Sequence, residues 1–208
     1  MAEISSEMRI FSGAGERLYL TEAERHRFLE SALEESRENR VFCSVLHYTG
    51  CRPSEALELA PDKILINEKV IVFRSLKKRK FDNKGNIKLP QYRQVPVPDK
   101  LIDDLDLVFD LRRIAKTGKG KDLPLWTMSR ATSWRMVKKV MARAGIKGKQ
   151  ATSKGLRHGF GIAMLSGEKA LPITILRDLM GHSDSKITEI YLQAVGAEKR
   201  NMVMNAWQ

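Results

Sequence analysis

Four short segments of this chain carry basic, histidine and tyrosine side chains that are suited to act on a phosphate group. In the first, Arg52 follows a Thr-Gly turn at the predicted start of a helix, and Glu55 stands three residues later. A helix N-terminus attracts anions, and a guanidinium presents two parallel donors that match two phosphate oxygens. The plainer alternative is a surface arginine paired with Glu55, and this segment alone favours that alternative.

The second segment is a basic run on a predicted β-hairpin, with Lys77, Lys78, Arg79 and Lys80 close to its turn. A lysine in such a place can enter a DNA groove or donate a proton to a leaving group. A solvated run of charge is the alternative, and it describes some of these lysines. Arg93 begins the next predicted strand, and we expect it to bind DNA together with Lys78, Arg79 and Lys80.

The third segment brings Lys154 and Arg157 to one face of a predicted helix, because residues three apart are neighbours on a helix surface. Both side chains are candidates for binding an anion. His158 stands beside them, and a histidine in that position more often packs within the fold than takes part in chemistry.

The fourth segment contains His182 at the end of one predicted helix and Tyr191 nine residues later. A tyrosine hydroxyl has a pKa of about 10, so it is a weak nucleophile unless its surroundings are strongly positive. Taken alone, a tyrosine near the end of a chain is usually a packing residue.

Charge is distributed unevenly over the 208 residues, which carry 37 Lys and Arg against 25 Asp and Glu, a net charge of +12. Residues 1–40 have a balance of −3, residues 74–93 of +7 and residues 111–157 of +13. Long stretches of one sign favour a polyanionic partner, most simply nucleic acid. Solvated lysine-rich loops are the alternative. A membrane surface fits less well, because the basic segments lack a strongly apolar helical face.

Other classes of protein are excluded by simple features of the chain. No segment approaches the roughly 18 consecutive apolar residues of a membrane helix, and the N-terminus lacks the pattern of a secretory signal. Cys43 and Cys51 are too few for a disulfide framework or a cysteine-based zinc site. We therefore expect a reduced, cytoplasmic protein.

The elements that must position these side chains are predicted to be mainly helical. Thr21 and Glu24 form a capping-box pattern at the start of the first helix. The hydrophobic spacing predicts helices over 38–49, a short stretch after Pro53, and 99–114, 131–144, 153–166, 172–180 and 186–206. Segments 65–67, 70–73 and 93–98 are predicted strands. The predicted fold class is mainly α (α+β), with one small three-stranded antiparallel sheet.

Together the four segments resemble the catalytic domain of the tyrosine recombinases, the phage-integrase family of site-specific DNA recombinases. The motif T-G-x-R-x-x-E corresponds to residues 49–55, and a hairpin lysine followed by R-x-V-P corresponds to Lys77 and residues 93–96. The box H/K-x-L-R-H corresponds to residues 154–158, and L-x-G-H-S-x(7)-Y to residues 179–191. The resemblance extends from about residue 17 to residue 195, and it depends on the order and spacing of all four motifs.

The resemblance implies an enzyme of the prokaryotic cytosol or nucleoid that breaks and rejoins DNA without ATP, metal or another cofactor. Tyr191 would attack a phosphodiester and form a 3′-phosphotyrosyl bond, while Arg52 and Arg157 stabilise the transition state. Lys77 would protonate the leaving oxygen, with Lys78 as an open alternative. His182 would contact the phosphate.

Two supporting roles and one departure also follow from the resemblance. Glu55 would orient Arg52, and His158 would support the site from within the fold. Lys154 occupies a position where many family members have histidine. A protonated lysine cannot accept the tyrosine proton, so we expect Lys154 to bind phosphate electrostatically, or to act as a base only if its pKa is depressed.

The implied organisation is an N-terminal arm over 1–16, a catalytic domain over 17–195 and a tail over 196–208 that is exchanged between subunits or packs on its own core. The implied partner is double-stranded DNA at a specific site, bound by a homo-tetramer. Many family members carry a further N-terminal DNA-binding domain, so this chain is either a piece of such a protein or a single-domain recombinase. Two other functions stay open: a catalytically inactive DNA-binding regulator, and a type IB topoisomerase-like enzyme.

Overall fold

The computed structural model describes residues 9–75, 89–166, 170–182, 184–193 and 207. Its helices are α1 (Glu22–Ala32), α2 (Arg37–Thr49), α3 (Pro53–Leu57), α4 (Asp99–Phe109), α5 (Leu111–Thr117), α6 (Arg130–Arg143), α7 (Ser153–Leu165), α8 (Ile173–Met180) and α9 (Ser185–Glu189). Short 3-10 turns cover Pro61–Lys63 and Ile190–Gln193. The strands are β1 (Ile64–Leu65), β2 (Val70–Arg74) and β3 (Tyr92–Pro96), joined as an antiparallel sheet in the order β1-β2-β3. The predicted fold class is therefore confirmed.

Local sequence signals explain where the first helices begin and end. At the start of α1, the Thr21 hydroxyl accepts the Glu24 N–H at 3.3 Å and the Glu24 carboxylate accepts the Thr21 N–H at 2.8 Å. Gly50 ends α2 at a positive φ of 57°, and a Cβ there would lie 2.4 Å from Cδ1 of Phe160. Only glycine fits both the backbone conformation and the space, so the turn that leads to Arg52 is fixed by Gly50.

Two predicted helices differ from the structure. The segment predicted as one helix over 99–114 is divided at Asp110, whose φ of 56° ends α4 and lets α5 begin in a new direction. Aspartate tolerates this left-handed conformation better than most residues. The last predicted helix, 186–206, is α only as far as Glu189 and continues as a 3-10 turn to Gln193, and residues 194–206 lie outside the described residues.

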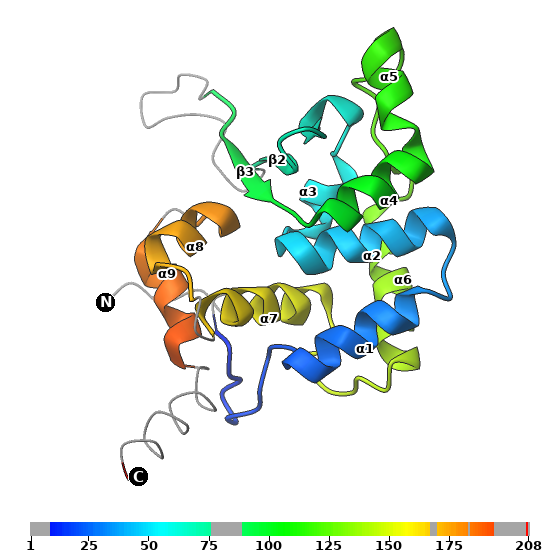
Figure 1. Ribbon diagram of the computed structural model, residues 1–208. Helices are drawn as coiled ribbons and strands as arrows, with labels where there is room; N and C mark the ends of the chain where they lie inside the picture. Colours follow the sequence, from blue (N-terminus) through cyan, green and yellow to red (C-terminus); the bar gives the residue numbers. More distant parts are fainter. Residues whose placement is uncertain (1–8, 76–88, 167–169, 183, 194–206, 208) are drawn as a thin grey trace.

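Helix α7 joins the two apolar clusters of the fold. Figure 1 shows α7 beneath α2, with the sheet on the far side of α2 and with α8 and α9 at one end of α7. Leu156 of α7 belongs to the larger cluster, built from α1, α2, α4, α6 and the sheet. Phe160 belongs to the smaller cluster, which contains Ile10, Met180 and Tyr191. Arg157 lies between these two residues in the sequence, so its backbone is held by both clusters.

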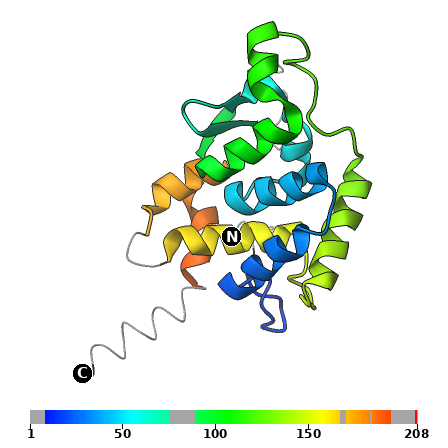
Figure 2. The ribbon, with the colours of Figure 1, turned by 45° about the vertical axis from the view of Figure 1, so that its right-hand side comes forward.

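The remaining helices complete the frame around α7. Figure 2 shows α6 along the side of the bundle, where it packs against α1 and α3. The predicted N-terminal arm is partly integrated into the fold, because Ile10 is buried and Phe11 pairs with Arg17 in an isolated bridge. Within the described part of the chain, no helix is both long and apolar enough to cross a membrane.

Candidate active site

A pocket of about 260 Å³ lies where α3, α6, α7 and the α8–α9 region meet. It collects six residues that were predicted from separate sequence segments: Arg52, Lys154, Arg157, His158, His182 and Tyr191. The predicted hairpin residues Lys77, Lys78, Arg79 and Lys80 lie outside the described residues. The pocket therefore unites three of the four segments, and the hairpin's contribution stays a prediction.

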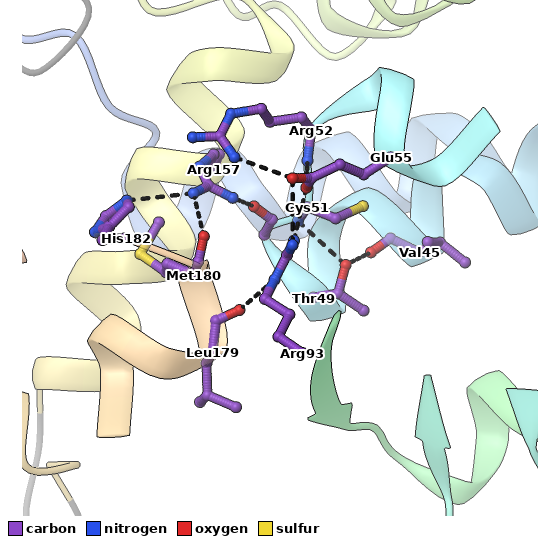
Figure 3. A network of polar contacts seen from close by, with 11 residues as sticks. Val45, Thr49, Cys51, Arg52, Glu55, Arg93, Arg157, Leu179, Met180 and His182 are labelled. Carbon is purple, nitrogen blue, oxygen red and sulfur yellow. Dashed lines mark hydrogen bonds and ion pairs between the residues drawn. The ribbon is translucent and has the colours of Figure 1, made fainter. Parts of the chain in front are cut away.

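Glu55 ties the first motif to the sheet. Its carboxylate accepts the Arg52 backbone N–H at 2.8 Å and the Arg52 Nη1 at 3.0 Å. It also accepts both terminal nitrogens of Arg93, at 3.2 and 2.6 Å, in the bidentate arrangement shown in Figure 3. Burial alone would raise the pKa of the Glu55 carboxyl, but the hydrogen bonds and charge of Arg93 outweigh burial and hold that pKa below 4.5. Glu55 is therefore an anion, and its two hydrogen bonds to Arg52 hold that arginine in place.

Arg93 has a place different from the one expected. Its side chain is 6% exposed, it pairs with Glu55, and its Nε donates to the carbonyl of Leu179 at 2.8 Å. The guanidinium also lies 5.0 Å from the centre of the Phe73 ring. The expectation that Arg93 binds DNA does not agree with this placement, because its charged head is used inside the protein to connect β3, α3 and α8.

Arg157 is held by the ends of two helices. Nη1 donates to the Gly50 carbonyl at 2.5 Å and Nη2 donates to the Met180 carbonyl at 2.7 Å. Helix C-termini carry partial negative charge, which favours a cation in this position. Burial, and then the nearby charge of Arg52, lower the pKa of Arg157 to about 10, so the group stays charged at neutral pH. These contacts, with a third to His182, use three of the five N–H groups of a guanidinium.

The contacts of His182 define its tautomer. Its Nε2 lies 3.2 Å from Arg157 Nη2, and an arginine can only donate, so Nε2 is the acceptor. Nδ1 then carries the proton and donates to the Thr188 hydroxyl at 3.0 Å. Burial, with the charges of Arg157 and Arg52, lowers the pKa of His182 to about 3. His182 is therefore neutral in the free protein, and Arg157 occupies its lone pair.

Tyr191 is enclosed at the edge of this pocket. It is 1% exposed, its hydroxyl lies 3.1 Å from Nδ1 of His158, and its ring is nearly parallel to that of His182 at 6.3 Å between centres. Burial raises the pKa of Tyr191 to about 12, against the opposing charges of Arg157 and Arg52. In the free protein the tyrosine is therefore a neutral phenol beside two guanidiniums.

The open side of the pocket contains residues that the motifs did not indicate. Arg130 and Trp134 stand one turn apart on α6, both are exposed, and both line the pocket together with Ser153 and the exposed Lys154. Trp134 is 56% exposed, whereas tryptophan is on average a highly buried residue. An Arg and a Trp four residues apart in a strongly basic segment were the available sequence signal for this wall.

The site has the chemistry of an anion pocket. Arg52, Arg130 and Lys154 line its open side, and the buried carboxylate of Glu55 is compensated by Arg52 and Arg93. Among the residues that the structure describes, no three His, Cys, Asp or Glu side chains gather as metal ligands would. The arrangement is suited to hold a phosphate between Arg52 and Arg157, within reach of a tyrosine hydroxyl.

A sequence profile described as the phage integrase family matches residues 18–197. The chain belongs to this family. Among curated proteins, this family member is 26% identical over 194 residues to "Tyrosine recombinase XerA" of Pyrococcus furiosus, covering 90% of the chain and 61% of that protein. It is 28% identical over 185 residues to a "Tyrosine recombinase" of Pseudothermotoga lettingae, covering 87% of the chain and 58% of that protein. The chain therefore spans about three fifths of the length of these relatives.

Solved structures give the same fold. The family member matches the crystal structure of the XerA recombinase with a TM-score of 0.69 at 26% identity, covering 90% of the chain and 64% of that structure. It also matches the catalytic domain of the bacteriophage HP1 integrase, with a TM-score of 0.57 at 21% identity, covering 89% and 93%. A structure of XerH bound to its difH substrate matches with a TM-score of 0.66 at 17% identity, covering 87% and 55%. The fold is that of a tyrosine recombinase catalytic domain.

Proposed function

We propose that this chain is the catalytic part of a site-specific DNA recombinase, which cleaves and rejoins DNA strands through a covalent 3′-phosphotyrosyl intermediate on Tyr191. The observation that carries the proposal is the pocket in which Arg52, Arg157, His182 and Tyr191 meet. Membership of a family whose relatives are named tyrosine recombinases supports it. The likeness to XerH bound to its DNA substrate supports DNA as the partner.

The proposed chemistry exchanges one phosphodiester for another. The Tyr191 hydroxyl gives up its proton as its oxygen bonds to phosphorus, and the bond to the DNA 5′ oxygen breaks as that oxygen takes up a proton. In the second step a 5′-hydroxyl of the partner strand gives up its proton and attacks the phosphotyrosine, and the tyrosine oxygen leaves and takes up a proton. Because each step conserves the phosphodiester, ATP is not needed. Arg52 and Arg157 would stabilise negative charge on the non-bridging oxygens in the transition state.

The proton donor for the leaving oxygen would come from the hairpin. We retain Lys77 as the candidate and Lys78 as its alternative, both outside the described residues. His182 would change partners when phosphate binds, because the phosphate competes for Arg157 and its negative charge raises the pKa of the imidazole. A protonated His182 Nε2 could then donate to the phosphate, as the family resemblance implies.

Lys154 is assigned an electrostatic role at the exposed wall of the pocket. We expect Lys154→Gln to slow covalent capture of DNA by roughly tenfold, equally at every pH, because only a screened positive charge is lost. The rate of capture between pH 6 and pH 9 is the measurement, with Lys100→Gln on α4 as the control. A loss confined to one limb of the pH profile would instead indicate proton transfer by Lys154.

Arg157 is expected to be far more sensitive to substitution. Arg157→Lys keeps a positive charge but removes the planar fork that spans two helix ends and a phosphate, and should slow covalent capture about 100-fold. The matched control is Arg177→Lys on α8, where the arginine pairs with Asp178 away from the pocket. Thermal unfolding of both variants separates catalysis from stability, and a change of less than about threefold in the rate would contradict the assignment.

The deciding experiment is covalent capture on a nicked duplex. Duplexes of randomised sequence are first selected for binding to the protein. The selected duplexes are then nicked close to the cleavage site, so that the short cleaved fragment diffuses away. Religation is then impossible, and the covalent intermediate accumulates. We expect an adduct that resists detergent and maps by mass spectrometry to the peptide containing Tyr191. Sequence-selective binding without an adduct on any selected duplex would reject the enzyme and favour a DNA-binding regulator.

The proposed partners are double-stranded DNA and further copies of the chain. We propose that a homo-tetramer assembles on DNA and that residues 196–208 are exchanged between subunits. Sedimentation with and without the selected duplex tests this assembly. DNA binding should also weaken steeply as salt rises, because the basic segments displace counterions from the backbone.

A further inference from the structure

His158 makes a buried contact with the proposed nucleophile. Its Nδ1 lies 3.1 Å from the Tyr191 hydroxyl oxygen, and the two ring centres are 5.7 Å apart. His158 is 4% exposed and Tyr191 is 1% exposed, so water does not compete for this hydrogen bond in the free protein. The contact crosses from α7 to the 3-10 turn that follows α9.

The other ring nitrogen of His158 indicates the direction of this hydrogen bond. Nε2 is buried and has no hydrogen-bond partner among the described residues. If Nδ1 accepted from Tyr191, Nε2 would have to carry a buried and unpaired N–H, and an orphaned donor of this kind costs about 1–3 kcal/mol. In the backbone, buried carbonyl acceptors are left unsatisfied somewhat more often than buried N–H donors, which favours an unpaired acceptor at Nε2 over an unpaired donor. We infer that Nδ1 carries the proton and donates it to the tyrosine oxygen.

Gly161 supports the ring of the same tyrosine. A Cβ at Gly161 would lie 2.8 Å from both Cε2 and Cζ of Tyr191, so any other residue would push the ring away. Glycine inside a helix costs roughly 1 kcal/mol relative to alanine. Gly161 and His158 are three residues apart and therefore share one face of α7. This face of α7 therefore leaves room for the Tyr191 ring, although a glycine at position 161 lowers the stability of the helix.

We propose that α7 forms a seat for Tyr191, in which Gly161 receives the ring and His158 donates its Nδ1–H to the hydroxyl oxygen. Both are positioning residues that act through Tyr191, and the proposal rests on the proposed role of Tyr191 as nucleophile. Because the oxygen accepts from His158, its own proton points away from His158. The donated hydrogen bond also favours the negative charge that develops when this proton leaves.

The seat assigns His158 a role other than general base. A base would need a free lone pair toward the tyrosine, whereas the inferred tautomer presents a proton there. Burial, with the charges of Lys154 and Arg157, lowers the pKa of His158 to about 3, which agrees with a ring that stays neutral. The tyrosine proton must therefore leave by another route than His158.

Two substitutions of His158 distinguish a role in positioning the Tyr191 hydroxyl from a role in filling space in the core. Asparagine can present an amide N–H close to the position of Nδ1, whereas leucine fills similar space without a donor. We expect His158→Leu to slow covalent capture by between about tenfold and 100-fold with unchanged DNA affinity, and His158→Asn to recover to within about threefold of the wild type. A fully active His158→Leu, or equal losses in the two variants, would overturn the seat.

A measurement on the DNA-free protein tests the contact independently of activity. Tyrosine is labelled with ¹³C at Cζ, and the Tyr191 signal is assigned by its absence in Tyr191→Phe. We expect this signal to shift in His158→Leu and Gly161→Ala but to stay near its position in His158→Asn and in the control Ala163→Ser. Near-ultraviolet circular dichroism first verifies that each variant is folded.

The two measurements distinguish failure of the seat from failure of the proposed function. An unshifted Tyr191 signal in both His158→Leu and Gly161→Ala overturns the seat, whether or not the wild type captures DNA. A shifted signal in a protein that never captures DNA supports the contact and rejects the recombinase function. A shifted signal together with slowed capture in His158→Leu and recovery in His158→Asn supports both.

Discussion

Replacing Tyr191 with phenylalanine is expected to abolish covalent capture of DNA while leaving the fold and DNA binding in place. The substitution removes one oxygen and keeps the ring that rests on Gly161. The loss should be at least about 1000-fold, more than 4 kcal/mol in the activation free energy, because no other group occupies the position of the hydroxyl oxygen. The measurement is the yield of detergent-resistant adduct on the selected nicked duplex.

The matched control for this substitution is Tyr92→Phe. Tyr92 is 52% exposed on β3 and lies outside the pocket, so the same oxygen is removed from a tyrosine without a proposed role. Stability should fall by about 1–3 kcal/mol in Tyr191→Phe, because the buried Nδ1–H of His158 loses its acceptor. An adduct that persists in Tyr191→Phe at the wild-type rate would show that another residue attacks the phosphate.

Much of the fold follows from signals that act over a few residues. The reciprocal hydrogen bonds of Thr21 and Glu24 start α1 where the sequence predicts, and Gly50 stops α2 in the one conformation that presents Arg52. The break at Asp110 was not predicted, because a positive φ is uncommon for residues other than glycine, even for aspartate.

The members of the site were easier to predict than their roles. The motifs indicate Arg52, Arg157, His182 and Tyr191, and the fold brings them to one pocket. Sequence cannot show which way a cation points, so Arg93 was expected on DNA although it is buried against Glu55. It also cannot show that Arg130 and Trp134, far from every motif, meet the pocket through the packing of α6 on α3.

Glu55 is expected to contribute more to stability than any other single carboxylate near the site. Its side chain is fully buried and accepts four hydrogen bonds, two from Arg52 and two from Arg93. Replacing Glu55 with leucine leaves the buried Arg93 without a counter-charge, and loss of one partner of a buried pair costs about 3–5 kcal/mol. The measurement is the free energy of unfolding in urea at pH 7.

A double substitution tests whether the loss of stability in Glu55→Leu arises from the unpaired charge of Arg93. Glu55→Leu with Arg93→Met removes both members of the pair, and apolar replacement of a whole buried pair is often neutral or stabilising. We therefore expect the double variant to be more stable than Glu55→Leu alone. Equal stabilities, or an additive loss, would mean that the carboxylate acts through packing and through its cap on the Arg52 N–H.

The pH dependence of stability gives an independent test of the same charge. The folded-state pKa of Glu55 lies below its ordinary value of 4.5, so the unfolded chain binds a proton more readily than the folded one as the pH falls. The stability from the ionised carboxylate is present above about pH 4.5 and is lost as the pH falls toward the folded-state pKa. The difference in unfolding free energy between the wild type and Glu55→Gln should therefore be largest at neutral pH and shrink in acid. The pKa of Glu24 is also lowered, to about 2, but Glu24 is common to both proteins, so its contribution cancels in this difference. A difference that does not change between pH 7 and pH 3 would show that the charge of Glu55 does not support the arginines around it.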